Sequence, residues 1–91
     1  MNTLKQILNT LDVTLEALRS GERGRKLSDA RALIAAALPL SQEQVAELLN
    51  CSRQAVGKMR RRHEGLLRSD ANYRAQWEQI LSLESLKSLK S

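Results

Sequence analysis

The stretch from residue 42 to residue 61, QEQVAELLNCSRQAVGKMRR, has the pattern of two short helices joined by a tight turn. The close crossing of two such helices requires a small side chain, which Ala46 supplies, and Asn50 stands where the turn favours a left-handed backbone. Ser41 and Ser52 precede the helices as N-caps, and Gln44 can complete a capping box with Ser41. We expect the core of this unit to contain Val45, Ala46, Leu49, Cys51, Val56 and Met59.

The second of these helices has a cationic outer face, because no acidic residue occurs between Arg53 and Arg62. Arginine near the start of a helix can pair with guanine in the major groove, and glutamine can pair with adenine. We therefore expect the base-reading residues to be Ser52, Arg53, Gln54, Gly57 and Lys58. Gly57 either lets the helix approach DNA closely or is a neutral position on an exposed face.

Further cations and helix starts are expected to hold the DNA backbone. Three adjacent arginines fan over most of a helix circumference, and the amides at the start of a helix attract phosphate. The expected phosphate-binding residues are Ser41, Gln42, Arg60, Arg61 and Arg62, with Arg25 and Lys26 as further candidates in an earlier loop. The alternative interpretation of the arginine run is a solvated face without a partner.

Apolar periodicity predicts helices on both sides of this unit. Residues 1–19 form one expected helix, with an apolar stripe of Leu4, Ile7, Leu8, Leu11, Leu15 and Leu18. A second expected helix is capped by Ser28, ends before Pro39 and has an apolar face of Ala30, Leu33, Ile34 and Ala37. Asp70 caps an expected helix over 70–81, whose apolar face is Tyr73, Trp77, Ile80 and Leu81. The sequence thus predicts one all-α domain over 1–91, with about five helices and a motif region at 28–67.

The two terminal apolar stripes predict a homodimer, since a small domain rarely exposes so much apolar surface outside an interface. A two-fold dimer would present its reading helices to successive major grooves. The end of the chain, residues 82–91, is built largely from Ser, Leu and Lys. We interpret it as a helix extension that frays or as a disordered tail.

Composition narrows the class of protein further. The net charge of +5 favours a polyanionic partner, either nucleic acid or an acidic membrane surface. A single cysteine, Cys51, fits a reducing compartment, and the absence of a signal peptide or a long apolar run predicts a cytoplasmic protein without membrane contact. His63 has no second ligand cluster, so we expect no metal. The sequence has no acid, base and nucleophile constellation, so we expect neither an enzyme nor a cofactor.

From about Ser28 to Ser82 the chain resembles the tryptophan repressor superfamily, which includes the DNA-binding domain of the bacterial replication initiator. The similarity lies in the opening segment 40–44, LSQEQ, and in the segment 73–81, YRAQWEQIL, which is similar to the repressor's final helix. The resemblance implies an intertwined helical dimer. It does not carry over the tryptophan site, because Ser28 and Lys58 stand where that pocket has arginines and Met59 follows in place of glycine. The initiator's Arg-Asp-His signature is replaced by Cys51-Ser52-Arg53.

The sequence therefore predicts a sequence-specific double-stranded DNA-binding protein, a transcriptional regulator of repressor type that does not use tryptophan. A DNA-binding component of a transposition, phage or plasmid replication system is the alternative within DNA binding. The alternative of another class is a protein-interaction adaptor, in which the first and last helices dock a partner and the motif is vestigial.

Overall fold

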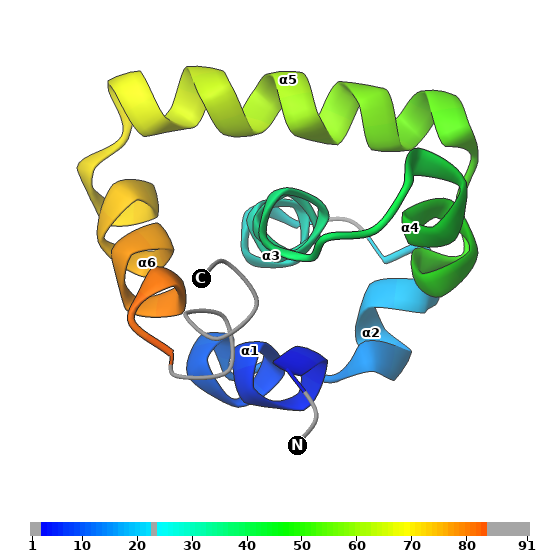
Figure 1. Cartoon of the computed structure of the whole chain (residues 1–91), viewed down its shortest axis with the longest axis horizontal. Helices are drawn as coiled ribbons and strands as arrows, with labels where there is room; N and C mark the ends of the chain where they lie inside the picture. The colour runs from blue at the N-terminus through cyan, green and yellow to red at the C-terminus, as the bar shows by residue number, and fades with distance from the viewer. Residues whose placement is uncertain (1–2, 23, 84–91) are drawn as a thin grey trace.

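A helix over residues 25–37 passes through the centre of the molecule, and the other helices surround it (Figure 1). The computed structural model describes residues 3–22 and 24–83, in which there are six α-helices and no strand. The helices are α1 (Thr3–Leu11), α2 (Leu15–Arg19), α3 (Arg25–Ala37), α4 (Gln42–Leu49), α5 (Arg53–Ser69) and α6 (Ala71–Leu81). The expectation of an all-α fold is confirmed.

Helix α3 is buried on most of its circumference, because α5, α6, α1 and α2 all pack against it. The expected face of Ala30, Leu33, Ile34 and Ala37 is buried, and so are Ala32 and Ala35 on other sides of the helix. Residues 32–37 of α3 are apolar all round, as is typical of a helix segment in a protein interior. The short alanine side chains let several neighbours approach the same helix closely.

The prediction of one helix over residues 1–19 is wrong, because the described part of this segment is divided into α1 and α2. Asp12 adopts a left-handed conformation with φ of 56°, and Thr14 begins α2 by accepting a hydrogen bond from the Ala17 amide at 3.1 Å. The leucine spacing continues across this break from Leu11 to Leu15, so the apolar periodicity does not reveal it. Residues 3–22 and 24–83 consequently contain six helices where about five were expected.

The start of α3 also differs from the expectation. The helix begins at Arg25, directly after Gly24 with φ of 153°, and Ser28 lies inside it. The Ser28 amide donates to the Gly24 carbonyl at 2.9 Å. Glycine therefore provides the helix start that we had assigned to serine, and Arg25 and Lys26 lie in the first helical turn instead of a loop.

The expected helix pair is present as α4 and α5. Ser41 and Gln44 form the capping box of α4, and Ser52 caps α5 by accepting the Ala55 amide at 3.1 Å. Asn50 is left-handed between them, with φ of 55° and ψ of 51°, and α4 lies steeply to α5 in Figure 1. The expected core residues Val45, Ala46, Leu49 and Val56 are buried, while Cys51 and Met59 are partly buried. Burial raises the pKa of the Cys51 thiol, which fits an apolar packing position.

The two terminal apolar stripes pack largely within the chain. Ile7, Leu11 and Leu18 are buried, and α1 lies against α3 and α6. Asp70 caps α6 as expected, and Tyr73 and Ile80 of that helix are buried. The stripes that suggested a dimer are thus mostly covered by the chain itself.

Of the expected tail, residues 84–91 lie outside the described residues. Within the described ranges, every helix is too short or too polar to cross a bilayer.

His63 of α5 is a buried polar residue, only 8% exposed. Its Nδ1 atom lies 2.6 Å from the Tyr73 hydroxyl, and the Trp77 ring packs edge-on with a centroid separation of 4.4 Å. Burial lowers the pKa of His63, an effect that the nearby Glu64 carboxylate partly opposes. The imidazole therefore joins α5 to α6 in its neutral form.

We predict that folding stability falls as the pH drops below about 6.5, the ordinary pKa of histidine. The folded chain holds the pKa of His63 below that value, so the unfolded chain binds the proton first and protonation favours unfolding. Urea unfolding at about pH 7 and about pH 5.5 measures the difference. The variant His63→Gln should lose most of this pH dependence. An equally steep dependence in the variant would assign it to other groups.

Candidate nucleic-acid interface

The starts of α4 and α5 lie together at one corner of the molecule. Gln42, Ser52, Arg53 and Gln54 line a shallow hollow there. Ser52, Arg53 and Gln54 are exposed, and Ser41 is exposed at the start of α4. The structure thus brings the first three expected base-reading residues together at the exposed start of α5.

Gln42 fastens the start of α4 to the start of α5. Its Nε2 atom donates to the Arg53 carbonyl at 2.5 Å, and a Cβ atom added at Gly57 would lie 3.3 Å from the same nitrogen. That separation is tighter than an ordinary contact, so the glycine makes room for the Gln42 amide. The small residue at 57, which we had considered for close approach to DNA, therefore has a packing role inside the protein.

Arg53 of α5 has an acidic neighbour on α4. Its Nη1 atom lies 3.7 Å from the Glu43 carboxylate of α4, and the two side chains are 69% and 76% exposed. An ion pair this exposed contributes little to stability. It holds the guanidinium near the start of α5 and can be exchanged for another acceptor at little cost.

Arg60 is directed toward the interior and not toward solvent. Its guanidinium donates to the Leu40 carbonyl at 3.0 Å and to the Ala35 carbonyl at 3.4 Å. These carbonyls lie at and just beyond the C-terminal end of α3, where a cation also interacts favourably with the helix dipole. The structure therefore gives Arg60, an expected phosphate ligand, a structural role.

The same arrangement recurs at four helix ends. Arginine side chains donate to carbonyl groups at or just beyond the ends of α2, α3, α4 and α5, at distances of 2.8–3.4 Å. The arginines, in the order of these helices, are Arg31, Arg60, Arg19 and Arg74. Asn50, which follows α4, adds a further donor at the end of α2, since its side-chain amide donates to the Arg19 carbonyl at 3.3 Å. A large share of the positive charge is thus used to hold the helices together.

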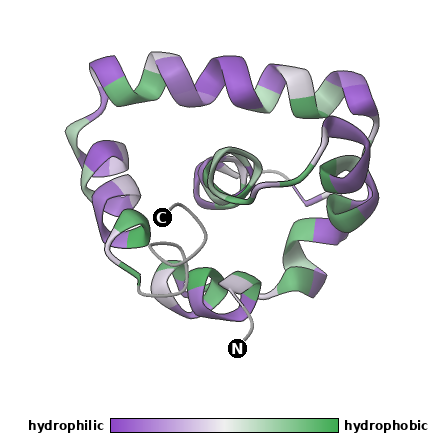
Figure 2. Ribbon diagram, viewed as in Figure 1, coloured by the Kyte–Doolittle hydropathy of each residue, from purple (hydrophilic) through white to green (hydrophobic). Residues whose placement is uncertain are grey.

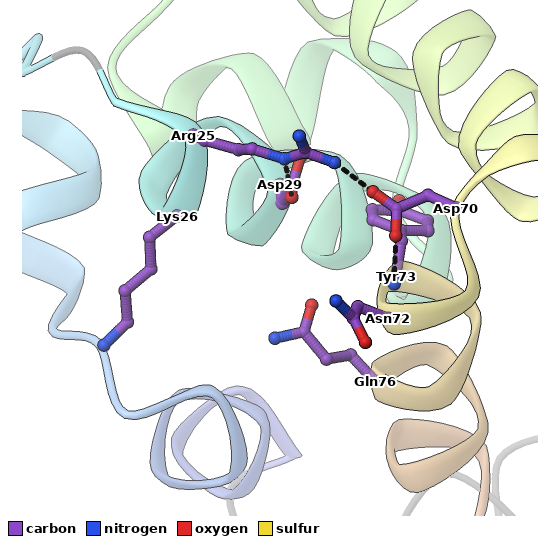
Figure 3. Close-up of a pocket in the computed structure, with 7 residues that line it drawn as sticks. All are labelled: Arg25, Lys26, Asp29, Asp70, Asn72, Tyr73 and Gln76. Atoms are coloured by element: carbon purple, nitrogen blue, oxygen red, sulfur yellow. Dashed lines mark hydrogen bonds and ion pairs between the residues drawn. The ribbon is translucent and has the colours of Figure 1, made fainter.

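Three other expected phosphate ligands are paired with carboxylates. Arg62 donates to Asp29 at 3.2 Å, and Arg25 lies between Asp29, at 3.7 Å, and Asp70 (Figure 3). Lys26 pairs at 3.7 Å with a carboxylate of the turn between α1 and α2. Arg25, Lys26, Asp29 and Asp70 line a polar hollow between α3 and α6, where the carboxylates offset the cations. The charged side chains around this hollow form a network of structural ion pairs.

Asp70 stays charged in that network. The Tyr73 amide and, to a smaller extent, the Arg25 guanidinium hold the pKa of the Asp70 carboxyl below its ordinary value. The same carboxylate caps α6 by accepting the Tyr73 amide at 3.1 Å. Asp70 therefore has two structural roles, at the start of α6 and beside Arg25.

The described residues contain no group of three or more His, Cys, Asp or Glu side chains that could hold a metal ion.

In the part of the chain that the structure describes, the unpaired cations lie on one surface. Among the described residues, Lys58, Arg61 and Arg68 are exposed, and their side chains make neither an ion pair nor a hydrogen bond. Their spacing places them with Gln54 on one face of α5, which is largely hydrophilic in Figure 2. We call Gln54, Lys58, Arg61 and Arg68 the basic stripe. Arg68 was missed in the sequence because it lies beyond the helix-turn-helix pattern, although its spacing from Arg61 places it on the same face.

We predict that Arg60→Ala destabilises the fold by about 1–3 kcal/mol, because the variant leaves two carbonyl groups without their charged donor. The matched variant Arg61→Ala should change stability by less than about 0.5 kcal/mol, because that exposed side chain makes no ion pair or hydrogen bond among the described residues. Urea unfolding followed by circular dichroism measures both variants. Equal losses in the two would contradict the different roles of these neighbouring arginines.

Comparison of the chain with protein-family models, with curated proteins and with solved structures found no match in any of the three.

Proposed function

We propose that this protein binds double-stranded DNA through α4 and α5, which act as a helix-turn-helix with α5 in the major groove. The observation that carries the proposal is the basic stripe. In the described residues, every cation outside it has an acidic, carbonyl or other partner, whereas Lys58, Arg61 and Arg68 have none. Unpaired cations on a single helix face provide the charge that a phosphate backbone requires.

The start of α5 is suited to reading bases. Arg53 can offer two parallel donors to guanine, and Gln54 can pair with adenine, while Ser52 is exposed beside them. Gln42 and Glu43 of α4 hold Arg53 from behind through its carbonyl and its guanidinium. The Gln42 hydrogen bond fixes the backbone at the start of α5, while the exposed Arg53 guanidinium can exchange Glu43 for a base.

The role that follows is that of a transcriptional regulator of repressor type, which covers its operator when bound. The resemblance to the tryptophan repressor superfamily supports this part of the proposal. The proposal does not include the tryptophan pocket of that superfamily, because Ser28 and Lys58 replace the arginines of the pocket. A regulator of this type differs from an adaptor by its salt-sensitive affinity for DNA.

We predict that the protein binds duplex DNA with an affinity that falls steeply as salt rises. Fluorescence anisotropy with a labelled duplex over a range of salt concentrations gives the slope. Arg61→Ala should make this slope shallower by about 1, because one phosphate contact is lost. Arg62→Gln serves as the control, since Arg62 is already paired with Asp29 and should change the slope less. Affinity that does not respond to salt, or binding to anionic vesicles in place of duplex, would contradict the proposal.

The same assay tests base reading once a preferred site has been selected from random duplexes. Arg53→Ala should weaken binding to that site by roughly 1–3 kcal/mol and relax the preference at one base pair. Arg61→Ala should weaken all duplexes alike. If Arg53→Ala leaves the preference unchanged, the start of α5 does not read bases.

We also propose that two copies act together, so that the two reading helices enter successive major grooves about 34 Å apart. The partly exposed Leu4, Leu8 and Leu15, with Trp77 of α6, supply the apolar surface for this contact. Light scattering behind a sizing column should give twice the 10.2 kDa of one chain. A mass of one chain at micromolar concentration would exclude a stable dimer in the absence of DNA.

A further inference from the structure

Gly65 lies in the interior of α5, where a glycine has a cost for helix stability. The residue is exposed, and a Cβ atom added to it would meet nothing within 4 Å. Its backbone is not in the left-handed region, unlike that of Gly21 and Gly24. Whereas Gly57 makes room for Gln42, no contact within the described residues requires a glycine at position 65.

The surroundings of Gly65 are cationic. Arg61 precedes it by about one helical turn and Arg68 follows it by about one turn, so the three residues share a face of α5. The only adjacent acid, Glu64, lines a different hollow together with Trp77 and Ala36. Gly65 is therefore a position without a side chain between two unpaired guanidinium groups of the basic stripe, and its carbonyl accepts a hydrogen bond from the Ser69 hydroxyl at 2.9 Å.

Helix α5 is longer than a major groove is wide. From Gln54 to Arg68 the helix extends about 21 Å at 1.5 Å per residue, whereas the major groove is about 12 Å wide. If the start of α5 lies in the groove, its C-terminal half extends to the sugar-phosphate strand that bounds it. The cations there match the charge of that strand.

We propose that the sugar-phosphate backbone of duplex DNA crosses α5 at Gly65, with Arg61 and Arg68 on the phosphates at either side. The absence of a side chain lets the strand approach the helix backbone closely. This inference rests on the proposed DNA binding and extends the interface beyond the helix-turn-helix. It gives a physical reason for a glycine that the fold alone does not need.

The test uses Gly65→Ala and Gly65→Leu in the full chain, with Ala75→Leu on an exposed part of α6 as the control. Leucine carries no charge and cannot donate to a phosphate, so a loss of affinity in this variant reports the space that its side chain occupies. Both Gly65 variants should unfold at a higher urea concentration than the unaltered protein, because a helix-breaking residue is gone. Duplex affinity should fall in the order glycine, alanine, leucine, by about tenfold for leucine. The slope of affinity against salt should stay the same.

Three results would overturn the inference, and they are distinguishable. If the unaltered protein binds duplex and Gly65→Leu binds it as tightly, the strand does not cross at Gly65, while the proposed function stands. If the unaltered protein does not bind duplex, the proposed function fails and this inference fails with it. A loss of affinity in Ala75→Leu equal to that in Gly65→Leu would also contradict a local contact at Gly65.

Discussion

The burial of α3 on most of its circumference is the constraint on which the rest of the structure depends. Several helices can pack on one helix only where its side chains are short, and Ala30, Ala32, Ala35 and Ala37 provide that surface. Because α5 turns Val56 and His63 inward in this arrangement, its opposite face must point to solvent. The position of the central helix therefore determines which residues of α5 a partner can touch.

The helices around α3 are held at their C-terminal ends by arginines. These side chains donate to carbonyl groups at the ends of α2, α3, α4 and α5, where cations also interact favourably with the helix dipole. The net charge of +5 is consequently a poor measure of the surface available to a polyanion. Much of the positive charge stabilises the fold, and the cations that remain unpaired among the described residues lie together on α5.

Local signals in the sequence predicted the parts of the fold that local chemistry determines. The caps at Ser41, Ser52 and Asp70 and the left-handed Asn50 each depend on residues close in sequence, and all are present. The break at Asp12 was missed because leucine periodicity continues through it. Within the candidate site, the exposure of Arg53, Gln54, Lys58 and Arg61 agrees with the pattern. Most partners of Arg60, Arg62, Arg25 and Glu43 could not be predicted, because they lie on distant segments of the chain and are set by packing. Only Asp29, four residues after Arg25 on the same helix, is a local partner.

The central claim is that the outer face of α5 is the surface that meets DNA. The most direct measurement is a titration of isotope-labelled protein with a short duplex, in which the amide resonance of each residue is followed by NMR. The account predicts that the largest changes fall on α5 from Gln54 to Arg68 and on the start of α4. Changes confined to α1 and α6, or none at all at low salt, would contradict it.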